Sequence, residues 1–569
     1  MSVRAKCLLT ASKVEQRGLN LKVAYVDGDN LLPRIDDILN KDLAHLDSTN
    51  ANVQLVKDTK TFLSQRKKMP VVSANAYLGI RAIKRGLEEG ADIVICGRVS
   101  DASPVMAAAA YWHGWSDDAY DELAGALIAG HIIECSTYGT GANFSGFFRY
   151  QTSELLNLGC PIVEIEANGS CHVTKHESLN GFVTPDIVKC QVLYELQGNI
   201  YLNSDVKADI THVQIQDESA NRVYVHGVKG YPPPPTTKLA VFYRAGYQCE
   251  VSINATGYAT SKKYDLQEAQ LRTKLADWDV LKDLDVIEFQ RLGEPKENPN
   301  GQLESTTSMR ILAQAKNQKT LQMIPAAFGY NAMAHFAGEL TAIEQPQSAE
   351  CCTDKLPGMH CTMDMRQMAP MPILGYYPGI LAQSELEEAV NIIGKDSKRI
   401  VIKSPAKTEP LQNRESYETA SPVDLAAFGP TANVPLGDIA LARSGDKGAN
   451  INIGIFVHGK EQWDWLRSFL TMDKMRQLMG RDWQEWYHLE RGKPTGRSND
   501  PYRTVLMSSP VELPDIAAVH FVIYGPLGRG VSSSTRLDGL GKGFAEFIRA
   551  VHVSVPRKLL EAANGVNGH

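Results

Sequence analysis

The sequence predicts an α/β protein: a mostly parallel sheet with flanking helices, a β-rich insertion and a small α+β domain at the C-terminus. Strand-like and helix-like segments alternate over residues 1 to about 200, and such alternation favours a parallel sheet covered by helices. Between residues 198 and 257, short β-branched runs replace this alternation and indicate an antiparallel insertion. A last group of short strands and helices follows residue 436 and suits a two-layer α+β sandwich.

Three short apolar runs in the first part of the chain are typical of strands, and each ends in polar residues. Strands are expected at 22–26, 70–75 and 93–96. Helices are expected at 76–89, 105–112 and 118–130. In open α/β sheets, ligands bind beyond the carboxyl ends of the strands. The polar residues at these ends are therefore the first candidates for a site.

The rest of the chain divides at a stretch that has no sustained apolar period. Residues 263–345 favour helices, whereas 404–434 have the composition of a linker. We expect a large α/β domain, the β-rich insertion within it, a linker, a C-terminal domain and a tail, at 1–394, 198–257, 395–435, 436–553 and 554–569.

Composition restricts the class of partner. The hydrophobic content of 43% and the charged content of 22% are ordinary for globular proteins. The net charge of −6 argues against nucleic acid, because phosphate binding needs a concentrated basic surface. No stretch approaches the roughly 20 apolar residues that span a bilayer. We therefore expect a cytoplasmic protein with neither a nucleic-acid nor a membrane partner.

The ten cysteines are scattered, several of them inside apolar runs, and no CxxC pair occurs. This pattern is typical of reduced, mostly buried thiols rather than of a disulfide framework or a zinc site. Cys351, Cys352, His360 and Cys361 come nearest to a metal-binding group, but their setting is typical of a polar loop. We therefore expect no metal.

The segment from Gly90 to Ser103 is the most informative in the chain. An apolar run ends at Cys96, and Arg98 and Asp101 follow it at once. A guanidinium and a carboxylate just past such a strand are placed to meet a substrate. The alternative is an Arg–Asp pair that fixes a tight turn.

A second polar segment runs from His131 to Gly146. Glu134 and Cys135 precede a turn rich in Gly, Ser, Thr and Asn, which includes Asn143. Glycines let backbone N–H groups approach a ligand, and successive amides in such a turn can form an anion-binding nest. This segment therefore adds to the first.

A third polar segment, Asp27 to Asn30, follows the first strand. Asp27 and Asp29 flank a glycine and could bind a metal, a ribose or a substrate hydroxyl. Asp29 or Asn30 could instead cap the helix that starts near Leu31. We expect capping by one of these residues and a functional role for Asp27.

Near the C-terminus, residues 443–448 combine two cations, an acid and two glycines. Arg443, Ser444, Asp446 and Lys447 would suit a phosphate or a carboxylate. The spacing is not that of a Walker loop. A flexible loop at 525–535 could close over the same site. The alternative is a solvated turn.

Seven phrases, spread over nearly the whole chain, resemble the acyclic terpene utilisation (AtuA-like) family. They are VAYVDGDNLLPR, VSANAYLGIRAI, GADIVICGRVSDASPV, GHIIECSTYGTGANFSGF, GYPPPPTTK, LGDIALARSGDKGANINIGIFV and VIYGPLGRGVSSSTRLDGLGK. The resemblance implies a ferredoxin-like C-terminal domain and a place in the degradation of branched or terpenoid acids as CoA thioesters. Members of this family usually have a further strand–helix unit before the strand at 22–26, and we expect this unit to be missing here.

Two enzyme classes lack their motifs. A serine hydrolase needs a GxSxG elbow beside a His/acid pair, and a nicotinamide enzyme needs GxGxxG after its first strand. A lyase, hydratase or isomerase that acts on a carboxylic acid or its CoA ester needs cations and an acid–base pair instead. This class is our expectation, and the alternative is a non-catalytic metabolite-binding or scaffold subunit of an enzyme complex.

Each candidate residue has an expected role in such a reaction. The expected catalytic residues are Asp101, Glu134 and Cys135. The expected substrate-binding residues are Asp27, Asp29, Arg98, Asn143, Arg443, Ser444, Asp446 and Lys447. The expected partner is a small carboxylate or an acyl-CoA, with no required cofactor, and the sequence leaves homo-oligomerisation open.

Overall fold

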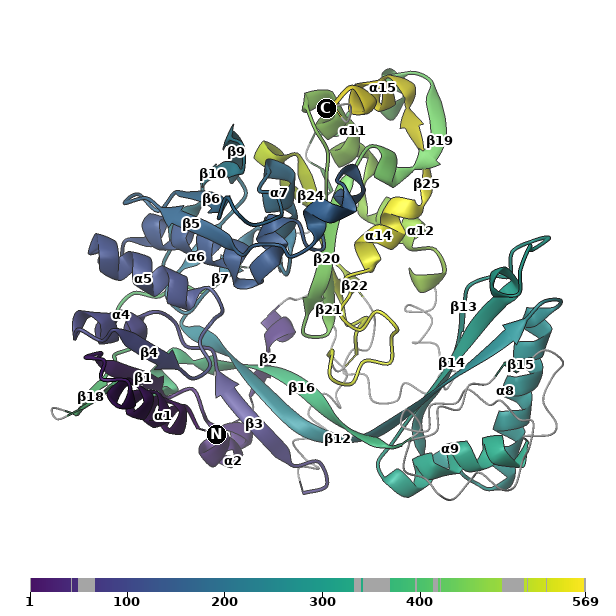
Figure 1. The fold of residues 1–569 in the computed structure, drawn as a ribbon, viewed down its shortest axis with the longest axis horizontal. Helices are drawn as coiled ribbons and strands as arrows, with labels where there is room; N and C mark the ends of the chain where they lie inside the picture. The colour runs from purple at the N-terminus through teal and green to yellow at the C-terminus, as the bar shows by residue number, and fades with distance from the viewer. Residues whose placement is uncertain are drawn as a thin grey trace.

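The structure is a computed structural model. It describes residues 2–41, 43–49, 67–331, 339–340, 369–394, 397–412, 418–419, 421–483, 506–508, 510–528 and 530–566. The N-terminal part contains several sheets, and the C-terminal part packs against its middle (Figure 1). Cys351, Cys352, His360 and Cys361, the metal-binding alternative, lie outside the described residues.

The first sheet has the strand order β18-β17-β1-β4. Its strands are β1 (Val23–Asp27), β4 (Ile93–Cys96), β17 (Ala389–Ile393) and β18 (Lys398–Val401). β1 and β4 run parallel, whereas β17 is antiparallel to β1 and to β18. Among the named strands of the described residues, β1 and β4 are the one parallel pair.

The expectation of a mostly parallel sheet is therefore wrong. The expected local elements form, but their partners come from distant parts of the chain. β3 (Val71–Ala76) does not join β1 and β4; it pairs antiparallel with β12 (Thr236–Thr256) in another sheet. β17, at residues 389–393, joins β1 from a position more than 350 residues later in the sequence. An alternation of strands and helices predicts which strands pair only if strands that follow each other in the sequence are also neighbours in the sheet. This is a tendency and not a rule.

Helices cover both faces of the first sheet. They are α1 (Val3–Gln16), α4 (Arg81–Glu88), α5 (Ser103–His113) and α6 (Tyr120–Glu134). Side chains of β1 alternate between the faces: Val23 and Tyr25 pack with Cys7 of α1, whereas Ala24 and Val26 share a core with α4, α5 and α6. Pro104 in the first turn of α5 and Gly114 in the left-handed conformation at its end (φ 66°) fix the limits of that helix.

The longest strand, β12, connects two regions of the N-terminal part. Its sheet has the order β13-β14-β12-β16-β2, and β15 also pairs with β12. The partners are β2 (Ala44–His45), β13 (Leu284–Leu292), β14 (Thr306–Ala315), β15 (Glu339–Leu340) and β16 (Met371–Ala382). β3 pairs with the first half of β12 and β14 with the second half, so β12 extends from the first sheet to the outlying helices α8 (Thr260–Asp277) and α9 (Gln318–Tyr330) (Figure 1).

The described residues of the N-terminal part also form two small antiparallel sheets and two short helices. One sheet contains β5 (Pro161–Ile165), β6 (Cys171–Lys175), β10 (Arg222–His226) and β9 (Gln214–Ser219) in that order. The other contains β11 (Lys229–Tyr231), β8 (Lys207–Asp209) and β7 (Ile200–Leu202). The helices are α2 (Ile35–Asn40) and α7 (Pro185–Leu193). The Thr184 hydroxyl caps α7 by accepting a hydrogen bond from the Ile187 N–H.

The C-terminal part is an antiparallel sheet with helices. The sheet contains β20 (Leu441–Lys447), β21 (Asn450–Phe456), β24 (Ala518–Tyr524) and β22 (Leu506–Met507), and β23 (Val511–Leu513) also pairs with β24. The helices are α11 (Lys460–Phe469), α12 (Met472–Met479), α14 (Phe544–Ala550) and α15 (Arg557–Val566). A separate ladder joins β19 (Thr431–Pro435) to β25 (His552–Pro556). Residues 444–447, expected to lie in a loop, belong to β20.

The two parts of the chain share one hydrophobic core. Residues of α6 and α7, such as Ile132 and Leu193, pack in the same cluster as Leu441, Phe456 and Ile516 of the C-terminal part. Gly454 of β21 allows this approach, because a Cβ there would lie 2.8 Å from two carbons of the Leu193 side chain. The C-terminal part is thus fixed to α6 and α7 by apolar contact, and its strand β20 contacts α7, the helix that ends just before Glu195.

Candidate functional site

Lys238 and Tyr77 lie together at the start of the long strand. Tyr77 follows β3, and its backbone N–H donates to the carbonyl oxygen of Lys238 (2.9 Å). The Lys238 ammonium lies 4.0 Å from the centroid of the Tyr77 ring. Within the described residues, Lys238 makes no side-chain hydrogen bond and no ion pair.

Charged side chains from both parts of the chain surround this pair. Burial raises the pKa of Tyr77, and Arg98, Asp101, Lys447 and Glu195 all act on it. Burial lowers the pKa of Lys238 to about 7, with Lys447 adding to the effect and Asp101 opposing it. A lysine with such a pKa is partly neutral at physiological pH, so it can both accept and return a proton.

Glu195 and Lys447 connect the two parts through an ion pair. The Lys447 Nζ lies 3.1 Å from Glu195 Oε2, and both side chains are mostly buried. Burial opposes the charge of each group, but the partner prevails: the pKa of Lys447 is well above its ordinary value, and that of Glu195 is lowered. Both groups are therefore charged at neutral pH.

His131 and Glu134 lie on the last turn of α6, beside this ion pair. His131 Nδ1 lies 3.2 Å from Glu134 Oε1 and 3.3 Å from the Tyr201 hydroxyl, and Nε2 lies 3.0 Å from the Gln191 carbonyl oxygen. Glu134 Oε2 is buried and has no hydrogen-bond partner among the described residues. Burial raises the pKa of Tyr201, while Lys447 lowers it and Glu134 raises it.

These groups form one set, which we call the interdomain cluster. It comprises Tyr77, Arg98, Asp101, Glu134, Glu195, Tyr201, Lys238 and Lys447. Its members come from the ends of β3, β4, α6 and α7 and from β7, β12 and β20. The cluster contains three carboxylates, three cationic side chains and two phenols, which suits it to proton transfer on an anionic or polarised substrate.

Arg98 extends from this cluster toward a groove at the carboxyl ends of β1 and β4. The guanidinium pairs with Asp101 (3.1 Å) and lies 5.2 Å from the centroid of the Tyr77 ring. The groove has a volume of about 1040 Å³, and Asp27, Asp29 and Arg98 contribute to its lining. Ligands of parallel-stranded proteins bind at such ends.

The two aspartates at the end of β1 have different settings in this groove. Asp29 is buried, and its Oδ2 accepts hydrogen bonds from Asn75 Nδ2 and from the Arg98 backbone N–H, both at 2.8 Å. Asp27 is more exposed and lies 3.4 Å from the Arg399 guanidinium. Asn30 Oδ1 accepts from the Leu32 N–H (3.2 Å) at the start of the short helical turn that follows. Asp29 thus ties the loop after β1 to the loop after β4, and Asp27 faces a cation.

A second group of candidate residues gathers around Arg443. Its guanidinium carbon lies 4.7 Å from the centroid of the Tyr138 ring and 4.5 Å from that of Tyr194. Arg443 Nη1 donates to the carbonyl oxygen of Asn143, which itself has a left-handed backbone (φ 51°). The Lys542 ammonium donates to the Tyr138 hydroxyl (2.7 Å), and this contact holds the pKa of Tyr138 below its ordinary value although burial raises it.

Cys135, Asp446 and Ser444 lie between or beside these groups. Burial raises the pKa of Cys135 to about 11, and Glu134 and Glu195 add to it, so its sulfur is protonated at neutral pH. Burial, followed by Glu195, raises the pKa of Asp446 to about 6. The buried Ser444 hydroxyl donates to the Gly541 carbonyl (2.7 Å) and accepts from the Ala545 N–H (2.8 Å), so backbone groups occupy it.

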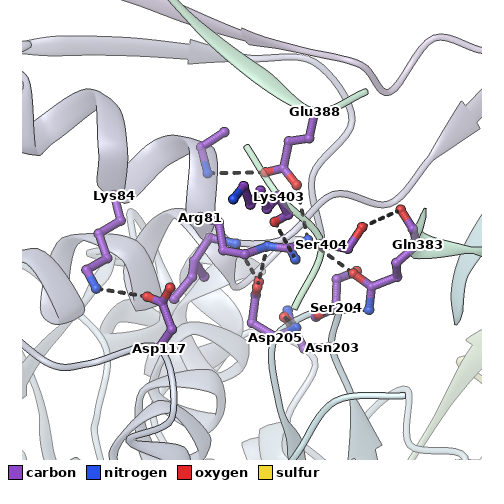
Figure 2. Close-up of polar contacts among 12 residues, drawn as sticks. Arg81, Lys84, Asp117, Asn203, Ser204, Asp205, Gln383, Glu388, Lys403 and Ser404 are labelled. Carbon is purple, nitrogen blue, oxygen red and sulfur yellow. Dashed lines mark hydrogen bonds and ion pairs between the residues drawn. The ribbon is translucent and has the colours of Figure 1, made fainter. Parts of the chain in front are cut away.

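A buried network under Tyr77 and Lys238 fixes their backbone. Figure 2 shows Arg81 between Asp205 (3.0 Å) and Glu388 (3.1 Å), with the Gln383 amide beside them. Asp205 also accepts the Ile80 N–H (2.6 Å), which anchors the start of α4. The Ser204 hydroxyl donates to the Tyr77 carbonyl oxygen (2.7 Å) and thus extends the network to the cluster.

The described residues contain no group of three or more His, Cys, Asp or Glu that could hold a metal ion. No helix within the described ranges is long and apolar enough to cross a membrane.

The structure thus brings some expected residues together and separates others. Arg98, Asp101, Glu134 and Lys447 belong to the interdomain cluster, and Arg443 lies beside Asn143. Asp27 and Asp29 lie in the groove, where Asp29 accepts the Arg98 backbone N–H. The sequence reasoning missed Tyr77, Glu195, Tyr201 and Lys238. Two of these stood in phrases that it quoted, since Tyr77 lies in VSANAYLGIRAI and Lys238 ends GYPPPPTTK.

Comparison with known families gives two matches. A model described as acyclic terpene utilisation family protein AtuA matches residues 5–392, and one described as the AtuA ferredoxin-like domain matches residues 434–554. No curated protein and no solved structure matches the chain. The first match contains Lys238 and the second contains Lys447, so each region contributes to the interdomain cluster.

Proposed function

The chain belongs to the acyclic terpene utilisation family AtuA and has its ferredoxin-like domain. We propose that it is an enzyme that transfers protons to and from a branched carboxylic acid or its CoA ester. The reaction is of the lyase, hydratase or isomerase type. The observation that carries the proposal is Lys238, a mostly buried amine without an anionic partner among the described residues, set among two further cations.

In this proposal, neutral Lys238 accepts a proton from the carbon next to the carboxyl or thioester carbonyl. The C–H electron pair moves toward the carbonyl oxygen, where negative charge develops. Arg98 supplies positive charge near that oxygen, as preorganised donors do in other enzymes that stabilise an oxyanion. Lys238 then returns the proton, to the same carbon or to a neighbouring one.

Tyr77 is the proposed acid for a leaving or entering oxygen. Burial raises its pKa, so its hydroxyl keeps its proton at the pH at which Lys238 is partly neutral. Two neighbouring groups whose environments hold one protonated and one partly deprotonated can serve as acid and base. Glu195 holds Lys447 as a charged neighbour and is not itself needed as a base.

The test is exchange of hydrogen for deuterium at the carbon next to the carbonyl, followed by mass spectrometry in D₂O. We expect the unmodified protein to exchange 3-methylbutanoyl-CoA or 3-methylbutanoate, and Lys238→Met to slow the exchange at least 100-fold. Lys262→Met removes a surface lysine that is 85% exposed, and it should exchange like the unmodified protein.

Equal exchange by Lys238→Met and the unmodified protein would contradict Lys238 as the base. Binding of either compound without any exchange would favour a metabolite-binding subunit over an enzyme.

A further inference from the structure

Arg443 is a buried arginine whose hydrogen bonds the described chain does not complete. It is 3% exposed, yet both Nε and Nη2 have no hydrogen-bond partner among the described residues. Among the described residues, no other arginine has two buried nitrogens without a hydrogen-bond partner. An unpaired buried donor costs about 1–3 kcal/mol, and more when it is charged.

The two unpaired nitrogens are the pair that recognises oxyanions. The N–H bonds of Nε and of Nη2 point in the same direction along one edge of the guanidinium. A carboxylate or phosphate binds such an edge through two parallel hydrogen bonds. The third nitrogen, Nη1, is already bonded to the Asn143 carbonyl oxygen, so the remaining edge is the one left for a ligand.

Neighbouring rings and strands hold this edge in place. The rings of Tyr138 and Tyr194 lie at 85° to each other with centroids 6.0 Å apart, and the guanidinium contacts both. Gly445 makes room for Tyr194, since a Cβ there would lie 2.2 Å from a ring carbon. The orientation of the guanidinium is therefore set before any ligand arrives.

The local charge also favours an anion. Lys542 donates to the Tyr138 hydroxyl and lies 5.0 Å from the centroid of that ring, so a second cation shares the same aromatic pair. Neither Arg443 nor Lys542 has a carboxylate partner within the described residues.

A second buried arginine of the same domain shows the contrast. Arg549 donates to the carbonyl oxygens of Ala440 (3.0 Å) and Ser145 (2.9 Å), and it pairs with Glu546 (2.8 Å). The fold can therefore satisfy a buried guanidinium at this interface, whereas Nε and Nη2 of Arg443 are buried without a hydrogen-bond partner among the described residues.

We propose that the Nε/Nη2 edge of Arg443 binds an oxyanion of a bound ligand, a carboxylate or a phosphate, between the two parts of the chain. The inference rests on the proposed function in taking this oxyanion as part of the substrate. The oxyanion at Arg443 is then a further charged group of the substrate, apart from the carboxyl or thioester carbonyl next to the carbon that reacts at Lys238.

The test is calorimetric titration of the full chain with 3-methylbutanoate, 3-methylbutanamide and inorganic phosphate. We expect saturable binding of 3-methylbutanoate, of phosphate or of both, and none of the neutral amide. Binding by the acid and not by phosphate would identify a carboxylate, and the reverse would identify a phosphate. Equal binding of acid and amide, or no binding of either anion, would overturn the proposal. This comparison needs no variant.

Variants then locate the site. Arg443→Lys keeps the charge but loses the two-nitrogen edge, so the dissociation constant should rise at least 10-fold. Lys542→Met should raise it about threefold, because it removes the neighbouring cation. Arg549→Lys is the matched control for a buried arginine and should leave binding within twofold. Unchanged binding by Arg443→Lys would place the oxyanion elsewhere and overturn the proposal.

One further variant separates this proposal from the proposed function. Lys238→Met should abolish deuterium exchange and still bind the oxyanion as the unmodified protein does. If Lys238→Met no longer bound the oxyanion, the oxyanion site at Arg443 would not be separate from the reacting site at Lys238.

Discussion

The Tyr77 N–H and the Lys238 carbonyl are bonded to each other at 2.9 Å, and the ammonium of Lys238 lies over the ring of Tyr77. The bond joins the loop after β3 to the start of β12, two segments about 160 residues apart in the sequence. The proposed acid and base are therefore held by backbone as well as by side-chain contact. Four predictions follow from the surroundings of this pair and from the contacts between the two parts of the chain.

Lys238→Met should stabilise the protein more at neutral pH than at alkaline pH. The pKa of Lys238 is about 7 in the folded chain against an ordinary value of 10.5, so between these values the unfolded chain binds more protons and the stability of the unmodified protein rises with pH. Methionine has no charge to bury, so it avoids the loss of stability that the charged Lys238 causes. The gain, about 2 kcal/mol at pH 7 after allowance for solvent screening, should shrink toward pH 10.

Urea denaturation of both proteins at several pH values between 6.5 and 9.5 measures this gain. Lys447, Arg98, Asp101 and Glu195 face Lys238 and are present in both proteins, so their own titration largely cancels in the difference. A gain that does not change with pH would mean that Lys238 titrates normally.

Asp446→Asn should show the opposite dependence on pH. The pKa of Asp446 is about 6 in the folded chain against an ordinary value of 3.8, so over this range the folded chain binds more protons and stability falls as pH rises. Asn does not titrate, so the variant avoids this loss of stability. Its free energy of unfolding should exceed that of the unmodified protein by an amount that grows from pH 4 to pH 6 and then levels off at about 2 kcal/mol. Glu195, Lys542 and Lys447 act on this carboxyl group and are unchanged. Denaturation midpoints that stay parallel across this range would contradict the prediction.

Gly79→Ala should destabilise the network beneath the cluster. A Cβ at residue 79 would lie 1.6 Å from Asp205 Oδ2, the oxygen that accepts the Ile80 N–H. The carboxylate would have to move away from Arg81, and overpacking of this kind costs about 1–3 kcal/mol or more. Gly301→Ala is the matched control, because nothing lies within 4 Å of its added Cβ. Equal melting temperatures of the two variants would show that the Asp205–Arg81 contact is not rigid.

The sequence predicts many of the helices and strands, but little of which strands pair with each other in the sheets. The apolar run at 93–96 is β4 as expected, and the helix expected at 105–112 is α5 within two residues at its start and one at its end. These limits depend on nearby residues such as Pro104 and Gly114. The helix expected at 118–130 is α6, which continues to Glu134 and so includes His131, because the apolar residues at 132 and 133 extend it by one turn.

The site depends on contacts that no local pattern encodes. Arg98 and Asp101 could be found because they follow a recognisable strand. Lys238 could not be singled out in this way, because it lies inside a long strand and becomes unusual only through burial against Tyr77 and proximity to Lys447, 209 residues later. The charges and glycines of residues 443–448 were enough to select Arg443 as a candidate. They could not show that Arg443 lies in β20 between the rings of two tyrosines.

Asn452→Ala should loosen the joint between the two parts of the chain. The buried Asn452 side chain donates to the Leu193 carbonyl oxygen (2.7 Å) and accepts the Glu195 N–H (3.1 Å). Alanine would leave both backbone groups buried without a partner, which costs about 2–4 kcal/mol. It would also release the residue that holds Lys447, so oxyanion binding and deuterium exchange should both weaken. Asn433→Ala, an exposed residue of β19, is the matched control and should change stability by less than about 0.5 kcal/mol. An Asn452→Ala protein as stable and as active as this control would show that the apolar core shared by α6, α7 and the C-terminal domain suffices to place Glu195 against Lys447.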